Sequence, residues 1–432
     1  MTDFTVDCFQ NEYLPEGADV MHAVLTVTSG GPDGPGPAAV PGTPATGTGG
    51  DPTDRAELLL IDVSGSMNGA KLQEAKAAVA AAVDCLPDGV RFGIVAGNHT
   101  ATVVYPHQPP LAVASDATRG AAKASLRHLR AEGGTAIGSW IHLATGLLRP
   151  ESGIRHAILL TDGRNEHESA PVLAQCLSNA EGVFQCDCRG VGADWEVAEL
   201  RRVATALLGS YDIVPEASGL QADFTAMMHQ ALSRQVDDVR LRVWAPKGAA
   251  VVVLKQLDPI ADLLGSGVPS SSLSVDFPTG AWGEESRDYH LAVRVPPGGV
   301  GDEMLAARVS LIVGDDTVAQ VLVRCTWTDD VARSTVLNRR VAAALGEDEM
   351  AEAIQEGIDA MRSGDVEQGT ARLGRAVRLA TEHGNDEVVE RLSALVDIED
   401  PATGLVRPRR AVDPTDLLIA ETRSTRTVRT RR

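Results

Sequence analysis

The segment that decides the fold is residues 56–66, AELLLIDVSGS. It begins with a largely apolar run, Ala56 to Ile61, as expected for a strand inside a sheet that is covered on both faces. Asp62, Ser64 and Ser66 follow at once and place one carboxylate and two hydroxyl groups where that strand ends. Oxygen-bearing side chains at the end of a buried strand indicate a cation site.

Two further segments supply the remaining groups that such a site needs. Gly133-Gly134-Thr135 precedes a helical stretch, and Thr161-Asp162-Gly163 follows a second apolar run, residues 158–160. Together with the first segment they offer three hydroxyls and two carboxylates. Mg²⁺ prefers six oxygen ligands at about 2.0–2.1 Å, so this donor set suits it.

These motifs resemble those of the von Willebrand factor type A (vWA) family with a metal-ion-dependent adhesion site. The family pattern is DxSxS, then Thr, then Asp, and the chain matches it at every position. The resemblance covers roughly residues 54–235. The matching residues are Asp62, Ser64, Ser66, Thr135 and Asp162.

The resemblance implies a role for each of these residues. Ser64 and Ser66 are expected to be direct neutral ligands of Mg²⁺, with Mn²⁺ as an alternative ion. Thr135 is expected to be a third ligand that engages or withdraws, while Asp62 and Asp162 hold coordinated waters or bind directly. An open coordination position would then take a Glu or Asp of a protein partner. The expected function is that of a cation-dependent protein-binding scaffold in intracellular signalling or assembly.

Other interpretations of the same residues remain open. Ser64 or Ser66 could simply cap a helix that starts near Lys71. The chain could also be the partner subunit of a separate AAA-type ATPase, a role that some vWA proteins fill.

A third interpretation is a metal-dependent enzyme, with the two Asp residues holding Mg²⁺ for phosphoryl transfer. The sequence contains no GxxxxGK[ST], GxSxG or HExxH motif and no GxGxxG after a strand. His167 and Glu168 are expected to shape ligand specificity rather than to move protons. We therefore expect no enzymatic activity.

Length and composition limit the remaining classes. A chain of 432 residues should hold two or three domains. A net charge of −20 argues against a nucleic-acid binder, and no run of about 20 apolar residues predicts a membrane span. The acidic N-terminus lacks the pattern of a secretory signal, so the expected location is the cytoplasm. Cys186 and Cys188 are expected to be small buried thiols on one strand face.

The chain divides into regions of different character. Apolar runs alternate with helical patterns over residues 54–235, which predicts an α/β doubly wound, Rossmann-like domain with one antiparallel hairpin at residues 91–105. Residues 236–328 predict an all-β sandwich, and residues 329–398 predict a helical bundle. Residues 30–53 are rich in Gly and Pro and predict a flexible linker. The strand-like residues 1–29 before it are expected to join the sandwich, as in the integrin β subunit, so that the metal domain is an insertion.

The last region, residues 399–432, is expected to be a disordered basic tail. Residues 407–432 carry eight Arg against three acidic residues. Hydroxyls beside Arg are plausible targets of a basophilic Ser/Thr kinase, and bacterial proteins of this family are often associated with such kinases and with phosphothreonine-reading proteins. The alternative is a solvated tail that folds back on the acidic body. The candidate phosphorylation sites are Thr422, Thr425, Thr427 and Thr430.

Overall fold

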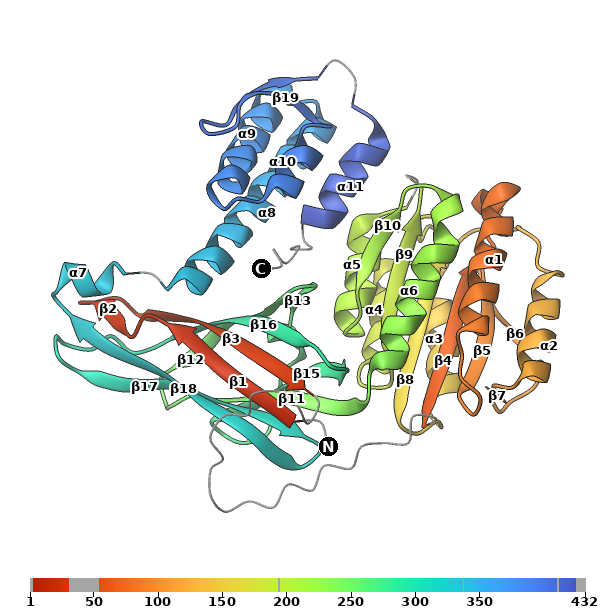
Figure 1. Cartoon of the computed structure of the whole chain (residues 1–432), viewed down its shortest axis with the longest axis horizontal. Coiled ribbons are helices and arrows are strands. Elements are labelled where there is room, and N and C mark those ends of the chain that lie inside the picture. Colours follow the sequence, from red (N-terminus) through yellow and green to blue (C-terminus); the bar gives the residue numbers. More distant parts are fainter. Residues whose placement is uncertain (1–2, 31–53, 193–194, 337, 410–411, 425–432) are drawn as a thin grey trace. The chain divides into compact units, whose positions relative to one another are not determined.

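The computed structural model describes residues 3–30, 54–192, 195–336, 338–409 and 412–424. It contains two compact units. The first unit comprises Met1–Gly47, Asp238–Thr279 and Glu284–Arg432, and the second comprises Thr48–Asp237 with Gly280–Gly283. Because the chain leaves the first unit and later returns to it, the second unit is an insertion in the first (Figure 1).

The inserted unit is built on a sheet with the strand order β10-β9-β8-β4-β5-β6. Strands β10, β9, β8, β4 and β5 are parallel, whereas β6 runs antiparallel at the edge beside β5. A short strand, β7, also pairs with β5 and was not predicted. The strands are β4 (Arg55–Asp62), β5 (Arg91–Gly97), β6 (Ala101–Tyr105), β7 (Ala112–Val113), β8 (Ile154–Thr161), β9 (Gln185–Val191) and β10 (Tyr211–Val214).

Helices cover both faces of this sheet. Side chains of α1, α2 and α6 share one apolar core with the sheet, and α3 packs against α4 (Figure 1). The predicted doubly wound α/β fold is confirmed. The helices are α1 (Ala70–Asp84), α2 (Asp116–Leu126), α3 (Ile137–Leu148), α4 (Ala170–Ala180), α5 (Val197–Ala206) and α6 (Leu220–Ser233), and short 3-10 turns lie at η1 (Gly65–Met67) and η2 (Ala217–Gly219).

One close contact fixes how α3 lies on the sheet. Trp140 is fully buried, and its indole Nε1–H donates to the carbonyl oxygen of Asn98 at 2.7 Å. A β-carbon added at Gly97 would lie only 2.2 Å from the Trp140 ring. Glycine at the end of β5 therefore allows the indole to cover the sheet backbone next to the edge where the motif residues lie.

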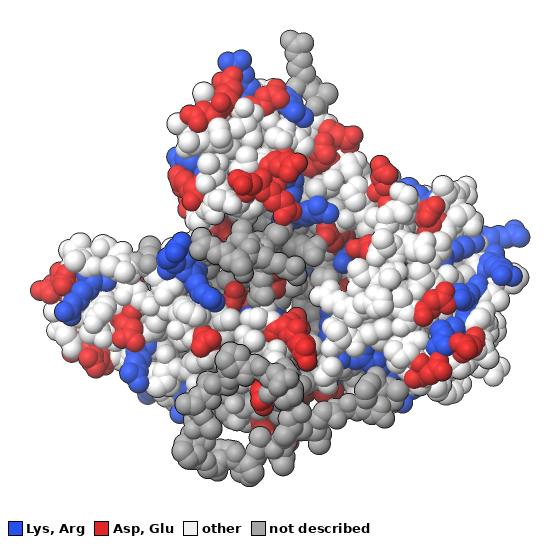
Figure 2. Space-filling model, viewed as in Figure 1, with Lys and Arg blue, Asp and Glu red and all other residues white. Residues whose placement is uncertain are grey.

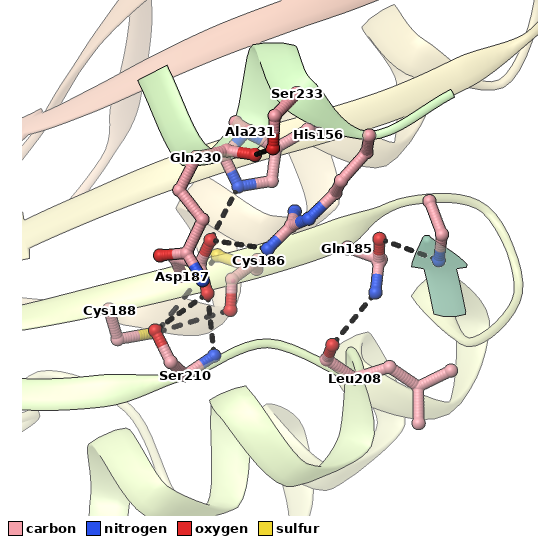
Figure 3. Close-up of polar contacts among 12 residues, drawn as sticks. His156, Gln185, Cys186, Asp187, Cys188, Leu208, Ser210, Gln230, Ala231 and Ser233 are labelled. Carbon is pink, nitrogen blue, oxygen red and sulfur yellow. Dashed lines mark hydrogen bonds and ion pairs between the residues drawn. The ribbon is translucent and has the colours of Figure 1, made fainter. Parts of the chain in front are cut away.

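A buried charge network lies near the amino ends of β4, β8 and β9, and Figure 3 shows the part around His156 and Asp187. His156 is fully buried between two carboxylates, with Nδ1 2.7 Å from Glu57 Oε2 and Nε2 2.8 Å from Asp187 Oδ2. Arg234 lies 3.3 Å from the same Asp187 oxygen. Arg55 donates to the carbonyl oxygens of Ala231 and Arg234, so the first residue of β4 is tied to the end of α6.

Both ring nitrogens of His156 face carboxylate oxygens, which favours an imidazolium that donates to both. Burial alone lowers the pKa of His156, but the two carboxylates outweigh this effect and the pKa is raised. Burial likewise raises the pKa of Asp187, yet Arg234 and His156 hold it well below its ordinary value. The network therefore holds charged groups in the interior of the inserted unit.

The larger part of the other unit is a sandwich of two sheets, with the orders β1-β3-β16-β12-β13 and β14-β15-β11-β17-β18-β2. Strands from before the insertion, β1, β2 and β3, lie in these sheets beside strands that follow it. The strands are β1 (Asp3–Gln10), β2 (Tyr13–Pro15), β3 (Val20–Gly30), β11 (Val236–Trp244), β12 (Ala250–Leu257), β13 (Ile260–Asp262), β14 (Val268–Pro269), β15 (Ser274–Trp282), β16 (Ser286–Arg294), β17 (Glu303–Val313) and β18 (Asp316–Thr328), with a 3-10 turn, η3 (Leu264–Ser266).

The helical region follows the sandwich and extends further than predicted. A hairpin and a helix fold within the segment that was expected to be a disordered tail, so that prediction is wrong for residues 399–409 and 412–424. Leu418 and Ala420 are buried, and α11 packs against α8 and α10 (Figure 1). The elements are α7 (Val331–Ser334), α8 (Arg339–Ser363), α9 (Val366–Glu382), α10 (Asp386–Leu392), β19 (Val396–Asp400), β20 (Leu405–Pro408) and α11 (Pro414–Ser424).

One candidate phosphorylation site is corrected by this helix. Thr422 is fully buried in α11, and its hydroxyl donates to the carbonyl oxygen of Leu418 at 2.7 Å. A kinase would have to unfold α11 to reach this hydroxyl. Thr425, Thr427 and Thr430 lie outside the described residues, and their phosphorylation stays a prediction.

Acidic side chains are spread over the visible face of both units rather than gathered in one patch (Figure 2). Across the described ranges, no helix is both long enough and apolar enough to cross a membrane. Cys186 and Cys188 are fully buried on β9, with their sulfurs 4.0 Å apart.

Candidate metal centre

The motif residues gather at one edge of the inserted sheet. Asp62 is the last residue of β4, and Asp162 directly follows β8, the parallel neighbour of β4. Thr135 lies just before α3. Ligands of open α/β sheets bind beyond the carboxyl ends of the strands, which is where these side chains lie.

Short polar contacts link the side chains of the first and third motifs. Ser64 Oγ lies 3.0 Å from Ser66 Oγ, and Ser66 Oγ donates to Asp162 Oδ1 at 2.6 Å. Asp62 accepts from the backbone N–H of Ser64 at 2.7 Å and from the hydroxyl of Thr161 at 2.5 Å. Both carboxylates are thus held in fixed orientations.

The position of Gly163 shows that the second motif joins the same cluster. A β-carbon built on Gly163 would lie 3.0 Å from Thr135 Oγ1, 3.4 Å from Ser66 Oγ and 3.8 Å from Ser64 Oγ. The hydroxyls of Ser64 and Ser66, from one segment, and of Thr135, from another, therefore lie close to one position beside Asp162. The structure brings all five predicted residues together.

The simpler interpretation, in which Ser64 or Ser66 caps a helix, does not fit these contacts. Helix α1 begins at Ala70 after Gly69, and no side chain caps it. Ser64 precedes the short turn η1, but its hydroxyl makes no capping bond there. Instead, both serine hydroxyls face the other motif side chains.

The electrostatics of the centre favour a bound cation. Asp62 and Asp162 are both fully buried. Burial, with a smaller contribution from the charge of Asp162, raises the pKa of Asp62 to about 6, although hydrogen bonds from Ser64 and Thr161 oppose the shift. Two buried carboxylates at one site need positive charge nearby, because unpaired buried charges are strongly unfavourable.

Lys71 supplies part of that charge. Its ammonium Nζ lies 2.6 Å from Asp162 Oδ2, on the carboxylate that also accepts from Ser66. The sequence motifs gave no sign of this contact. Its position on the first turn of α1 places a cationic side chain within reach of the motif.

The residues present fit a hard divalent cation. The available donors are neutral hydroxyls and carboxylate oxygens, the ligand types that Mg²⁺ takes from proteins. The three hydroxyls lie within 3.8 Å of the position that a β-carbon would take at Gly163. The residues that would hold the ion are Asp62, Ser64, Ser66, Thr135 and Asp162.

Residues outside the motifs hold the Thr135 loop in place. The Asn165 side chain accepts from the backbone N–H of Ile137 at 2.7 Å, and the backbone N–H of His167 donates to the Thr135 carbonyl at 3.0 Å. The His167 ring covers Gly134, where an added β-carbon would lie 1.8 Å from the ring. Only glycine allows this close approach.

Glu168 has a structural contact that the sequence did not reveal. Its Oε1 accepts from the backbone N–H of Gly138 at 2.5 Å and from the side chain of Asn165 at 2.8 Å. Glu168 therefore satisfies the first turn of α3, and its part in ligand specificity stays a prediction. The spacing of Glu168 three residues after Asn165 was only a weak sign in the sequence of its contact with α3.

Replacing Lys71 by Met is expected to tighten Mg²⁺ binding about five- to tenfold. The ammonium of Lys71 competes with a cation for Asp162, and removing a like charge at this range is worth roughly 1 kcal/mol or more. Isothermal titration calorimetry would measure the change. Lys123→Met, which removes a surface lysine paired with Asp84, is the control and should leave affinity unchanged. Unaltered or weaker binding in Lys71→Met would show that the ammonium does not compete.

Comparisons with known proteins agree with this architecture. A model described as von Willebrand factor type A domain matches residues 58–213, and one described as von Willebrand factor type A C-terminal domain matches residues 378–424. The second match includes β19, β20 and α11, in agreement with a folded end of the chain.

Two curated proteins match part of the chain. An uncharacterized protein of Synechocystis is 28% identical over 48% of this chain and 47% of its own length. Inter-alpha-trypsin inhibitor heavy chain H4 of Bos taurus is 29% identical over 34% of this chain and 17% of its own length. The chain thus spans less than half the length of these curated relatives.

Solved structures extend the likeness to the whole chain. The ArnB paralog VWA2 from Sulfolobus acidocaldarius shares the fold, with a TM-score of 0.55 at 14% identity over 98% of both chains. A von Willebrand factor type A protein from Catenulispora acidiphila is 42% identical, with a TM-score of 0.91 over 99% of this chain and 98% of that chain. With this likeness across both units, and with the strand ends and motif residues described above, the chain belongs to the von Willebrand factor type A family.

Proposed function

We propose that this protein binds a protein partner through a divalent cation held at the ends of β4 and β8. One observation carries the proposal: the hydroxyls of Ser64, Ser66 and Thr135 meet beside Gly163 and Asp162, and Asp62 ends the neighbouring strand β4. Mg²⁺ is the proposed ion and Mn²⁺ an alternative. The partner is a protein that presents an Asp or Glu.

The donor set explains why the centre would attract a carboxylate. When bound, the cation would supply an electron-poor position for an acidic oxygen, since most of its protein donors are neutral hydroxyls. Ser64, Ser66 and Thr135 provide those hydroxyls. Asp62 is oriented by Thr161 and by the Ser64 backbone, and Ser66 is exposed, so the centre is open to solvent on that side.

The neighbouring side chains support a binding role rather than catalysis. His167 packs its ring over Gly134, and Glu168 is engaged by the first turn of α3. Both groups therefore stabilise the Thr135 loop, and neither is positioned by these contacts as a proton donor or acceptor for a substrate. We propose that the centre has no catalytic function.

A pull-down in the presence and absence of Mg²⁺ tests this function. Partners retained by the full-length protein in Mg²⁺ should be released by EDTA and restored by added Mg²⁺. Thr135→Ala, which removes one hydroxyl ligand, should weaken retention by at least about tenfold, equivalent to ~1.4 kcal/mol. Thr225→Ala on α6 is the control, since its hydroxyl donates to the Gln221 carbonyl of its own helix and takes no part in the centre. Partners that stay bound in EDTA would rule out the proposed mechanism.

A further inference from the structure

A groove runs along the outer edge of the inserted sheet, between β6 and the end of α2. Its volume is about 510 Å³, which is within the range of about 300–1,000 Å³ that ligand sites occupy. We propose that this groove receives an extended acidic segment of the partner protein, next to the residue that meets the cation. The proposal rests on the proposed function and names the chemistry of the partner.

The groove begins at the metal centre. Val63, which lines it, stands between Asp62 and Ser64, and its carbonyl oxygen accepts from the backbone N–H of Glu132 at 2.8 Å. Asn98, another lining residue, donates to the Glu132 carbonyl at 3.1 Å. A chain that places a carboxylate at the cation can therefore continue directly into the groove.

The groove continues away from the carboxyl edge of the sheet. Thr102 pairs with Ala96 near the end of β5, whereas Tyr105 pairs with Ile94 further back. At ~3.3 Å per residue, the stretch from Thr102 to Tyr105 covers roughly 10 Å. This length accommodates about three residues of an extended segment. β6 has a paired neighbour on one side only, so this wall is an edge of the sheet.

The side chains that line the groove define the complementary partner. Val103, Val104 and Leu129 provide apolar surface. His107 and Arg130 are exposed cationic or hydrogen-bond-donating groups at the rim, and His128 is a third. In the part of the chain that the structure describes, no hydrogen bond or ion pair engages these three side chains. They remain available to carboxylates of a bound segment.

The neighbouring cations of α2 differ from those of the groove. Arg119 is paired with Asp88 and Asp116, and Lys123 is paired with Asp84. In a chain with a net charge of −20, unpaired basic groups beside a cation site favour an acidic ligand. Basic side chains are visible at the right-hand end of Figure 2, where α2 and β6 lie in Figure 1.

Glu132 sets the direction of the segment. It is the acidic side chain among the groove residues and lies at the metal end, three residues before Thr135. Acidic groups that follow the metal-bound carboxylate are thus favoured beside His107, His128 and Arg130 rather than beside Glu132. The expected segment has one Asp or Glu for the cation, then apolar residues alternating with acidic ones.

Fluorescently labelled synthetic peptides provide the test with the full-length protein in Mg²⁺. The acidic probe has a leading Glu followed by alternating Val and Asp, the basic probe replaces each Asp by Lys, and the third probe replaces the leading Glu by Gln. Fluorescence anisotropy should show binding of the acidic probe and at least about tenfold weaker binding of each of the others. The double variant His128→Glu with Arg130→Glu should also weaken the acidic probe at least about tenfold.

Controls separate the groove from the cation site and from the fold. Arg127→Glu reverses an exposed charge on the same segment outside the groove and should bind the acidic probe as the wild type does. Mg²⁺ titrations and thermal melts of both variants should match the wild type. If the double variant binds Mg²⁺ more weakly or melts at a lower temperature than the wild type, His107→Glu replaces it. The same loss of acidic-probe binding is expected from His107→Glu.

The outcomes distinguish the two proposals. If the wild-type protein binds Mg²⁺ but does not bind the acidic probe, or binds the basic probe equally well, the groove assignment is wrong. The same conclusion follows if the double variant binds the acidic probe as tightly as the wild type. If the wild-type protein fails to bind Mg²⁺, the proposed function itself is wrong.

Discussion

Asp62→Ala is expected to reduce Mg²⁺ affinity by more than about 100-fold, equivalent to ~2.7 kcal/mol or more. Asp62 is one of only two carboxylates in the centre, and both of its oxygens are oriented by hydrogen bonds from Ser64 and Thr161. Without Asp62, the site keeps one carboxylate, which is already shared with Ser66 and Lys71. Isothermal titration calorimetry on the purified full-length variant would measure the loss.

The same substitution should have only a moderate effect on folding. Truncation leaves the Ser64 N–H without its acceptor, which costs roughly 1–3 kcal/mol, whereas the Thr161 hydroxyl keeps the Gly163 carbonyl as an acceptor. Asp84→Ala, at an exposed position paired with Lys123, is the control and should bind Mg²⁺ normally. A folded Asp62→Ala protein with wild-type Mg²⁺ affinity would mean that this carboxylate has no part in cation binding.

His156→Ala is expected to lower the free energy of unfolding by roughly 3–5 kcal/mol, the usual effect of removing one partner from a buried ion pair. Glu57 and Asp187 would then face each other without the imidazolium between them. Arg234 would remain near Asp187, but Glu57 would keep only Arg55 at 4.0 Å. Urea denaturation followed by circular dichroism would measure the loss.

The control for this variant is His142→Ala on the exposed face of α3. Surface substitutions of this kind change stability by about 0.5 kcal/mol or less. A His156→Ala protein as stable as the control would show that the network does not stabilise the fold.

The pH dependence of stability provides a second test of the network. The pKa of His156 in the folded protein is raised above 6.5, so its contribution is fully present below pH 6.5 and is lost as pH rises through the folded pKa. In that window the folded state binds the extra proton, and the unfolding free energy should fall by up to ~1.4 kcal/mol per pH unit. His156→Ala should lack this fall. An identical pH profile in both proteins would show that His156 is not the group that titrates.

Much of the metal centre could be predicted from the sequence because its residues lie in short motifs at strand ends. Parallel strands bring their carboxyl ends to one edge, so Asp62 and Asp162 were expected to meet. Lys71 and Glu168 could not be assigned in the same way. Their contacts depend on how α1 and α3 are oriented, which no local pattern specifies.

The buried network was overlooked for a related reason. Glu57, His156 and Asp187 are polar residues in strands that are almost entirely buried. Their pairing follows from the strand order β9-β8-β4, which joins residues 31 and 99 positions apart in sequence. Each of these polar residues was visible in the sequence, but its partner on the neighbouring strand was not.

The end of the chain was misjudged because net charge was given more weight than apolar spacing. The stretch Leu417-Leu418-Ile419-Ala420 carries the buried face of α11 and lies between basic segments. This face is buried because α11 packs against α8 and α10, which precede it in the chain. Composition described the charge of this segment correctly but did not reveal the helix.

The most direct test of the central claim is an anomalous difference map from crystals soaked in Mn²⁺. We expect one strong peak in the inserted unit, within bonding distance of the Ser64 and Ser66 hydroxyls and beside Asp162. The absence of a peak at this position, with the three loops placed as described here, would contradict the claim.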